Sequence, residues 1–597
     1  MCGIFGSVGV TLGNANIVAA LTALRHRGPD GWGVWTTDPD SPEGTAIWPA
    51  DPDRPWPCNE GQFPILESPR EVLLANTRLG LCGHGPHSRQ PVSAIGRGAI
   101  TFNGEIYNYR SLRTGLERDG FQFRSDSDTE VLLAGFLRWG PAVVHRLDGP
   151  FAFAIWDSAN RRLFGARDRF GEKPFYFTHE SASRKFAFAS TPRALFAAGL
   201  ASGAVSDSIA AGYLFARTPP SGDETFFDDM RRLPQGCSFE YIPDTSQLHI
   251  AEFSSSSFEV DPTATADPNH LRTILIEGME LRRQANSPVA LCLSGGVDSG
   301  NLAASARSRL TCFSLINTVD SQPIGENAFP DEREQVKSIE VALPNLSIAF
   351  LPIGNEITFA NFQRFVSDHD EPPLNSGSFV QWLLMKKIAE TGTRVVITGQ
   401  GADELFWGYP WYIPTYSRDH HWDRVWRDDF GGRLAAGSAA VNMADIDQLR
   451  RQELFRTRLP QHLRDDDSNS MAHGIETRNP YLGRHVVDIA LSLPASECFQ
   501  QRTTKYPVRA AFSSTLPADV AWGKTKRGLY IDCTSQWSDQ LLVEGRRALE
   551  QSAVLARIAD PRQLRDDLTQ GRMSSGMLWR LVALASAEAA ASSRAGR

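Results

Sequence analysis

The chain has 597 residues, too many for one hydrophobic core, so we expect at least two domains. A hydrophobic fraction of 41%, a net charge of -8 and a pI near 6.0 are typical of a globular protein and argue against a nucleic-acid binder or a membrane-surface protein. We find no secretory signal and no apolar run long enough to span a membrane, which favours a cytoplasmic protein with small-molecule substrates and no nucleic-acid or membrane partner.

The first 200 residues predict a layered α+β domain. Runs of β-branched and aromatic residues separated by Gly, Pro, Asn and Asp are typical of strands joined by turns. The expected strands are Glu71–Ala75, Ala99–Phe102, Phe151–Trp156 and Arg162–Ala166. Helical periodicity marks Ala15–Arg25 and Asp128–Arg138, and residues 37–66 are interpreted as a surface insertion.

The second half predicts a different architecture. Residues 254–268 resemble a linker, and an amphipathic helix is expected at Asn269–Arg283. Val289–Leu293 and Arg394–Thr398 are short apolar runs that each lead into glycine. Such strands between helices predict an open parallel α/β sheet with ligands at the carboxyl ends of its strands. The Ala/Ser-rich end, from Ala585, is expected to fray into a disordered tail.

Cys2 follows the initiator Met1. Removal of Met1 would leave a thiol and a free α-amine on one residue, and an amine of pKa about 7.7–8.0 can take the thiol proton near neutral pH. In isolation, a chance small residue after the start codon is the commoner explanation. The motifs further along the chain favour the catalytic interpretation instead.

Three further motifs accompany Cys2: His26–Asp30 (HRGPD), Asn103–Asn108 (NGEIYN) and Ala166–Tyr176 (ARDRFGEKPFY). Together they resemble the class II glutamine amidotransferases, the N-terminal-nucleophile family, over roughly residues 2–195. The resemblance implies that Cys2 attacks the side-chain amide of glutamine.

The resemblance also implies the partners of this nucleophile. The side chain of Asn103 and the backbone N–H of Gly104 would form the oxyanion hole. Arg78 would bind the α-carboxylate of glutamine and Asp128 its ammonium group, with Glu105 nearby. Without the motifs, surface ion pairs would explain Arg78 and Asp128 better.

A candidate phosphate loop, Leu293–Ser299 (LSGGVDS), follows an expected strand and precedes a helix expected at Asn301–Arg309. Small residues there expose backbone N–H groups at a helix N-terminus, which makes an anion site. The loop resembles that of ATP-pyrophosphatases, which cleave ATP to AMP and pyrophosphate. The residues implied in ATP or pyrophosphate binding are Leu293, Ser294, Gly295, Gly296, Asp298, Ser299, Gly399 and Gln400.

A second loop, Gly399–Tyr409, follows the apolar run Arg394–Thr398 and also carries Asp403 and Glu404. Mg²⁺ prefers carboxylate and phosphate oxygens together, so we expect Asp298 and Asp403 to hold it. Glu404 is expected to be structural.

Further along, Met471–Leu482 resembles a motif of the asparagine synthetases, and Lys505–Phe512 and Leu516–Gly528 resemble the next segments of that family. The resemblance covers about residues 270–530. It implies catalytic roles for Glu476 and Lys526, the lysine stabilising oxyanion or pyrophosphate charge. Lys524 is the alternative if the alignment slips.

The resemblances imply four segments and one activity. A glutaminase domain at 2–205 is followed by a connecting segment at 206–268, an ATP-pyrophosphatase domain at 269–585 and a tail at 586–597. The implied activity is glutamine-dependent amidation of a carboxylic acid through acyl-AMP, with ATP and Mg²⁺ required. L-Aspartate is the leading acceptor, and whether the protein forms a homodimer is left open.

Three departures from the family pattern, Gly300, Gln400 and Gly483, are interpreted as changes in the acceptor half. They keep open an acceptor from polysaccharide or specialised-metabolite biosynthesis. The insertion at Trp411–Gln452 would either reshape the substrate entrance or form a surface helix pair.

Rival activities are less consistent with the motifs. A lactam synthetase typically loses the cysteine, and a glucosamine- or purine-type amidotransferase should lack Ser294–Ser299. A non-catalytic paralogue would not be expected to retain complete motifs in both halves.

Overall fold

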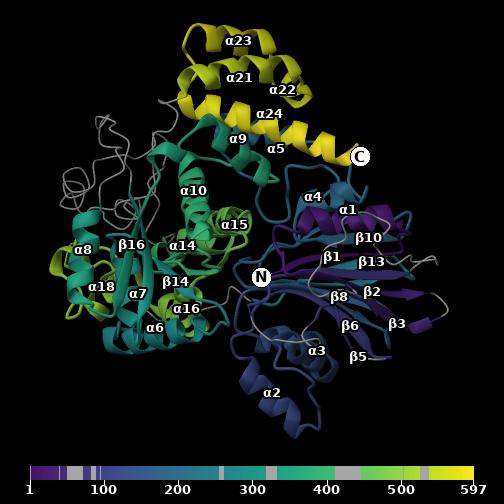
Figure 1. The fold of residues 1–597 in the computed structure, drawn as a ribbon, viewed down its shortest axis with the longest axis horizontal. Coiled ribbons are helices and arrows are strands. Elements are labelled where there is room, and N and C mark those ends of the chain that lie inside the picture. The colour runs from purple at the N-terminus through teal and green to yellow at the C-terminus, as the bar shows by residue number, and fades with distance from the viewer. Residues whose placement is uncertain are drawn as a thin grey trace.

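The computed structural model describes residues 2–38, 41–49, 71–81, 89–94, 96–254, 261, 263–316, 332–409, 446–501, 503–524 and 537–596. Two domains lie side by side, and a layer of helices from the end of the chain covers the top of both (Figure 1). The start of the first strand lies on the side of its domain that faces the other domain.

Two antiparallel sheets form the N-terminal domain. The first has the strand order β11-β9-β10-β1-β4-β2-β3 and the second β13-β12-β8-β7-β6-β5. Their strands are β1 (Cys2–Val8), β2 (Gly31–Asp38), β3 (Ser41–Ile47), β4 (Val72–Arg78), β5 (Val92–Ala94), β6 (Gly98–Gly104), β7 (Phe151–Asp157), β8 (Arg162–Arg167), β9 (Tyr176–Glu180), β10 (Lys185–Ala189), β11 (Arg231–Arg232), β12 (Cys237–Ile242) and β13 (Gln247–Glu252).

Helices cover the outer face of each sheet. The first sheet carries α1 (Asn14–Leu24) and α4 (Pro192–Ala197), and the second carries α2 (Tyr109–Arg118), α3 (Asp128–Trp139) and the 3₁₀ helix η3 (Gly140–Arg146) (Figure 1). Because both faces of the sheets are covered, β1 and β7 are buried at every position and are apolar nearly throughout. The expected layered α+β domain is confirmed.

A five-stranded parallel sheet, β16-β15-β14-β17-β18, forms the C-terminal domain. Its strands are β14 (Val289–Cys292), β15 (Leu310–Ile316), β16 (Leu346–Pro352), β17 (Val395–Ile397) and β18 (Glu476–Arg478). Around it lie α6 (Pro268–Arg282), α7 (Val297–Ser305), α8 (Arg333–Ala342), η6 (Gly354–Glu356), α9 (Phe359–Asp368), α10 (Ser376–Glu390), α11 (Ala402–Leu405), α14 (Ile446–Phe455), α15 (Arg458–Met471), η8 (Pro480–Leu482), α16 (Arg484–Ser492), α17 (Ala495–Cys498), α18 (Tyr506–Phe512) and α19 (Ala518–Ala521). The expected open parallel sheet is confirmed.

The helical layer consists of α21 (Ser538–Gln551), α22 (Ala553–Ile558), α23 (Pro561–Thr569) and α24 (Ser575–Ala595). Helix α24 crosses from α9 of the C-terminal domain to α4 of the N-terminal domain (Figure 1). The expected disordered tail is therefore wrong as far as Ala595. Its small residues allow close packing, since Ala591 is buried against Gly203, and Arg594 lies 3.0 Å from Asp370.

The expected connecting segment, 206–268, is only partly a connector. It holds α5 (Asp207–Ala211) and the π-helix η4 (Gly212–Ala216), but then β11, β12 and β13, which extend the two N-terminal sheets. Buried and half-buried side chains alternate along β12, as in a strand with one face on the core. The N-terminal domain thus extends to Glu252 rather than ending at residue 205.

Helix positions largely follow the sequence. Helices α1 and α3 begin and end within one residue of expectation, whereas α7 begins at Val297, inside the phosphate loop, and ends at Ser305. The insertion at 37–66 is described only in part, where β3 pairs with β2, and most of Trp411–Gln452 lies outside the described residues.

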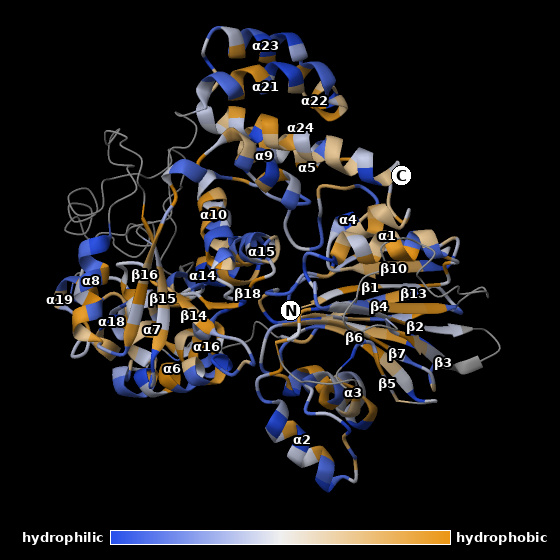
Figure 2. Ribbon diagram, in the orientation of Figure 1, coloured by the Kyte–Doolittle hydropathy of each residue, from blue (hydrophilic) through white to orange (hydrophobic). Residues whose placement is uncertain are grey.

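Hydropathy separates the cores from the region where the domains meet. The strands are largely orange in Figure 2, whereas α15, which faces the N-terminal domain, is largely blue. Among the described residues, no helix combines the length and the apolar character that a membrane span requires.

Candidate active sites

Cys2 opens β1, a central strand of the first sheet. It pairs with Arg78 on β4, and it is 7% exposed. Its backbone nitrogen donates a 3.0 Å hydrogen bond to Oδ1 of Asn103. Removal of Met1 would turn this nitrogen into the α-amine, so the Asn103 carboxamide would hold the amine beside the thiol.

Asn103 and Gly104 end β6 in the second sheet, next to Cys2. The Asn103 side chain is fully buried, and its Nδ2 has no hydrogen-bond partner within the described part of the chain. Gly104 has a φ of +154°, and a Cβ there would lie 2.2 Å from the carbonyl oxygen of Pro150, so only glycine fits. A buried amide with an unused donor beside a thiol is the arrangement that an oxyanion hole needs.

Two carboxyl groups lie close to this pair. Asp128, at the start of α3, accepts a 3.0 Å hydrogen bond from the Ile106 backbone N–H. Burial raises the pKa of Asp128 to about 6. Glu105 directly follows Gly104, and burial raises its pKa to about 7 even though the Arg478 guanidinium opposes the shift. The structure thus brings Cys2, Arg78, Asn103, Gly104, Glu105 and Asp128 into one region.

The candidate phosphate loop lies between β14 and α7, where the sequence predicts it. The Ser299 hydroxyl accepts a 3.0 Å hydrogen bond from the Ser294 backbone N–H, which folds the loop back on itself. A cavity beside the loop is lined by Ser294, Gly295, Gly296, Asp298, Asp403, Gly408, Thr504, Lys505, Arg509 and Lys524, among others. Leu293 is buried behind the loop.

The second loop follows β17 and touches the first. A Cβ on Gly399 would lie 3.3 Å from the Cβ of Asp298, and Gln400 next to it is half-exposed. Glu404 is buried and bonded to the hydroxyl of Tyr409 at 2.7 Å, which fits the expected structural role. The cavity is therefore bounded by loops from two neighbouring parallel strands.

Lys505 joins the two loops. Its Nζ lies 2.6 Å from Asp298 Oδ2 and 2.7 Å from Asp403 Oδ1. Burial opposes the charge on Lys505, but the two carboxylates outweigh it and raise the pKa of the amine. Two carboxylates that converge on one point are a donor set that fits Mg²⁺ beside phosphate. The segment Lys505–Phe512 resembles part of the family pattern, but the resemblance implies no role for Lys505, because no local pattern shows that it meets Asp298.

The two residues implied as catalytic in this domain are Lys526 and Glu476. Lys526 lies outside the described residues, whereas Lys524 lines the cavity. Glu476 lies on β18, is 1% exposed and bonds to Arg478 at 2.7 Å. It does not appear among the described residues that line the ATP cavity and lies instead where the two domains meet.

Two of the three sequence departures are packing positions. A Cβ on Gly300 would contact Leu516 and Val520, at 3.3 and 3.4 Å. A Cβ on Gly483 would lie 3.1 Å from the carbonyl oxygen of Pro480. Gln400 directly follows Gly399, which faces Asp298. The interpretation of all three positions as changes in the acceptor half stays a prediction.

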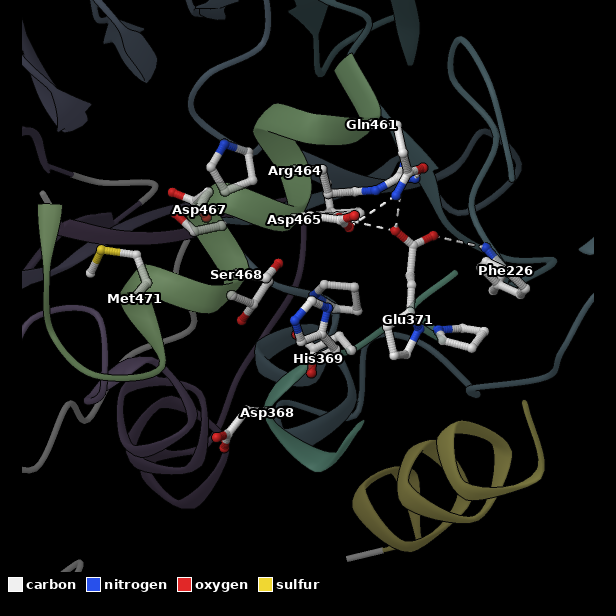
Figure 3. Close-up of a pocket in the computed structure, with 18 of the residues that line it drawn as sticks. Phe226, Asp368, His369, Glu371, Gln461, Arg464, Asp465, Asp467, Ser468 and Met471 are labelled. Carbon is white, nitrogen blue, oxygen red and sulfur yellow. Dashed lines mark hydrogen bonds and ion pairs between the residues drawn. The ribbon is translucent and has the colours of Figure 1, made fainter. Parts of the chain in front are cut away.

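A second cavity lies between the domains (Figure 3). Helix α15 contributes Gln461, Arg464, Asp465 and Ser468, while Glu371 points in from the opposite side and bonds to the backbone of Phe226. The domains are joined here by three ion pairs with little exposure: Arg27–Asp467 at 2.7 Å, Arg232–Glu371 at 2.8 Å and Arg193–Asp370 at 2.6 Å. Breaking such a pair leaves a buried charge uncompensated, so the domains are held in one relative orientation.

Comparisons with known proteins match the chain to two families. Residues 63–251 match a glutamine amidotransferase domain, and residues 270–591, more than half of the chain, match an asparagine synthase domain. Asparagine synthetase 1 (glutamine-hydrolyzing) of Bacillus subtilis (strain 168) is 26% identical over 480 residues, covering 70% of this chain and 74% of that protein. Asparagine synthetase B of Escherichia coli (strain K12) is 23% identical over 592 residues, covering 94% and 88%.

Among solved structures, glutamine phosphoribosylpyrophosphate amidotransferase of B. subtilis, complexed with ADP and GMP, has a TM-score of 0.32 and 15% identity, covering 59% of this chain and 90% of that one.

The matched regions and the two sheet architectures define a glutamine amidotransferase domain joined to an asparagine synthase domain. The chain belongs to the asparagine synthase family. Its class is that of the carbon–nitrogen ligases that take nitrogen from glutamine.

Proposed function

We propose that this protein hydrolyses glutamine at Cys2 and transfers the ammonia to a carboxylic acid activated as acyl-AMP, with L-aspartate as the leading acceptor. One observation supports the proposal most strongly: the same chain contains both the Cys2–Asn103 pair and the Asp298–Lys505–Asp403 cluster. The first suits amide cleavage and the second suits pyrophosphate departure from ATP.

In the glutaminase half, the Cys2 thiolate attacks the amide carbon of glutamine. Asn103 Nδ2 and the Gly104 N–H stabilise the oxyanion, and the α-amine delivers a proton to the departing ammonia. Water then releases glutamate from the thioester. Arg78 binds the α-carboxylate, and Asp128 binds the ammonium group, because a carboxyl group with a pKa of about 6 is mostly ionised above neutral pH.

In the synthetase half, an oxygen of the acceptor carboxylate attacks the α-phosphorus of ATP and pyrophosphate leaves. The Ser294–Ser299 loop and Lys505 bind the pyrophosphate charge. Mg²⁺, which shields phosphate charge, would be held by Asp298 and Asp403. Ammonia then attacks the acyl carbon, and AMP leaves. Lys526, or Lys524 at the cavity wall, stabilises the second oxyanion.

We propose that ammonia passes directly from one site to the other, and the interdomain cavity supports the beginning of such a route near Cys2. In bulk water at neutral pH ammonia is mostly protonated and is then not a nucleophile, so a route closed to solvent preserves its reactivity. Arg27 bonds to the carbonyl oxygen of Cys2 at 3.3 Å and also lines the interdomain cavity of Figure 3. The cavity thus begins one side chain away from the nucleophile.

A panel assay of pyrophosphate release tests the proposal. The full-length enzyme, ATP and Mg²⁺ are supplied with glutamine or ammonium and one carboxylic acid at a time, starting with L-aspartate. We expect pyrophosphate and the amide in equal amounts with one acid or a few related ones. Failure of every acid to give ATP-dependent pyrophosphate would falsify the synthetase assignment. Activity with another acid and not with aspartate would favour the alternative acceptor class, for which Gln400 is the motivating departure.

A further inference from the structure

One short segment touches both candidate sites. Glu476–Leu482 comprises β18, Asn479 and η8, and it lies between the glutaminase domain and the loops that bound the ATP cavity. On one side it meets Glu105 and Glu172, and on the other it meets Thr398 and Asp298. We call it the bridging segment.

Arg478 makes the contact with the glutaminase side. Its side chain is fully buried and forms an ion pair with Glu105, the residue that directly follows Gly104. It also bonds to Glu476 at 2.7 Å and to the carbonyl oxygens of Arg282 and Gln284 at 2.6 and 3.0 Å. The guanidinium is therefore fixed on several sides, which fixes the Glu105 carboxylate in turn.

A movement of Glu105 would change the position of the Gly104 amide in the candidate oxyanion hole. The backbone N–H of Glu105 donates to Pro150 O at 2.9 Å, the same oxygen that leaves no room for a Cβ on Gly104. The Gly104 and Glu105 amides thus share one tight contact with the neighbouring strand. A change in the position of the Glu105 side chain would tilt the Gly104 amide, whose N–H is the expected oxyanion donor.

The other end of the bridging segment touches the ATP loops. The Thr398 hydroxyl, just before Gly399, donates to Asn479 Oδ1 at 2.6 Å. The Tyr481 hydroxyl donates to the carbonyl oxygen of Asp298 at 3.1 Å. Leu482 packs over Gly401, where a Cβ would lie only 2.4 Å from its methyl group. Ligand binding that moves either loop would therefore press on this segment.

Asn479 gives the segment a second link across the interface. While its Oδ1 accepts from Thr398, its Nδ2 donates to Glu172 Oε2 of the glutaminase domain at 2.9 Å. A buried carboxamide with both ends used cannot turn without losing hydrogen bonds on both sides. The two links hold the segment in a defined position between the domains.

From these contacts we infer that Arg478 is a positioning residue that couples occupancy of the ATP cavity to the readiness of the glutaminase oxyanion hole. The inference rests on the proposed function. Nothing places Arg478 against a substrate: it acts through Glu105 on one side and through the backbone of Asn479 on the other. The consequence is that glutamine is cleaved fastest when ATP is bound, which limits waste of glutamine.

The test measures how fast Cys2 is alkylated by a diazoketone analogue of glutamine, in the full-length protein, with and without MgATP. The readout needs no acceptor acid. We expect MgATP to raise the wild-type alkylation rate at least about fivefold, the low end of typical coupling between sites. In Arg478→Lys, which keeps the charge but loses the fork, the ratio should fall below about twofold.

Two further variants separate coupling from general damage. Thr398→Val removes only the hydroxyl that reaches Asn479 and should also lower the MgATP ratio, even if Arg478→Lys folds poorly. Arg394→Met is the matched control. Arg394 forms an ion pair with Asp30 at 2.6 Å, which also links the two domains. Both side chains are about one-third exposed, so this pair is not buried as the Arg478 pair is. Its ratio should equal that of the wild type.

A pH profile adds a readout that a purely structural role would not change. The Arg478 charge lowers the pKa of Glu105, so Arg478→Met, which removes that charge, should move the alkylation profile toward higher pH, whereas Arg478→Lys should not. Equal wild-type alkylation with and without MgATP, or an unchanged ratio in both Arg478→Lys and Thr398→Val, overturns the coupling and leaves the proposed function intact. Absence of Cys2 alkylation under every condition overturns both.

Discussion

The two candidate sites differ in the surroundings of their carboxyl groups. On the glutaminase side, burial raises the pKa of Glu105 to about 7 and of Asp128 to about 6. On the ATP side, Asp298 and Asp403 share the ammonium of Lys505. The first site is suited to an amide substrate on which charge develops only during reaction. The second already holds a cation between its carboxylates and is suited to phosphate.

The two sites also differ in the secondary structure that carries their side chains. Cys2 and Asn103 lie on strands inside two sheets and are nearly or fully buried. The Ser294–Ser299 and Gly399–Asp403 segments are loops and helix starts at the carboxyl ends of parallel strands. A site on strands is preorganised, whereas a site on loops can adjust to its ligand. The comparison therefore predicts sharp losses at the first site and ligand-dependent losses at the second.

The largest effect is expected for Cys2→Ala. Glutamine-dependent amidation should fall by at least about a thousandfold because the nucleophile is gone, while ammonium still serves as the nitrogen donor. Amide formation with each nitrogen source measures this. Cys237→Ala, a buried cysteine in the same domain, is the matched control and should keep both activities. Equal loss with glutamine and ammonium would contradict a separate glutaminase site.

Asn103→Ala should lower the kcat of glutamine hydrolysis by about 10²–10³, since it removes one oxyanion donor. Glutamate release at saturating glutamine is the measurement. The KM should change little, because the unused Nδ2 donor serves the transition state more than the bound substrate. A raised KM with normal kcat would assign Asn103 to ground-state binding instead.

Lys505→Met should reduce ATP-dependent pyrophosphate formation by about a hundredfold, the effect expected when a buried transition-state charge loses its partner. It also leaves Asp298 and Asp403 facing each other without their shared cation, so the loss should shrink as the Mg²⁺ concentration rises. Lys387→Met, which removes a half-buried lysine paired with Glu356 away from the ATP cavity, should have no such effect. Loss that is independent of Mg²⁺ would mean that the metal does not use these carboxylates.

The smallest effect concerns stability and pH. Burial raises the pKa of Asp128 to about 6, so the folded protein binds this proton more tightly than the unfolded chain. Stability from this group is therefore lost as pH rises from about 4 to about 6. Asp128→Asn cannot ionise and so does not lose this stability. The Tm of the variant minus the Tm of the wild type should therefore increase as the pH rises from about 4 to about 7.5, by a few degrees at most. A Tm difference that moves the other way would show that Asp128 is held ionised.

Much of the fold and part of each candidate site could be predicted from local patterns. Periodicity located α1 and α3 within a residue, and apolar runs before glycine located β14 and β17. Composition gave a wrong prediction for the Ala/Ser-rich end of the chain, which was expected to be disordered. It forms part of helix α24, whose small residues pack closely against Gly203. The alternation along β12 was readable, but which sheet it joins depends on its pairing with β8, some 70 residues away in sequence.

The proposed nucleophile and the proposed phosphate loop could be predicted from the chain alone, because a cysteine directly after Met1 and a glycine-rich turn between strand and helix are patterns of residues that are close in sequence. The meeting of Lys505 with Asp298, and of Arg478 with Glu105, 373 positions away, became visible only in the folded molecule. Such contacts leave no local pattern, since any arginine or lysine can pair with any acid that the fold brings near. The electrostatic interaction in such a pair is stronger when the pair is buried, and the pair between Arg478 and Glu105 is buried only when the two domains pack together.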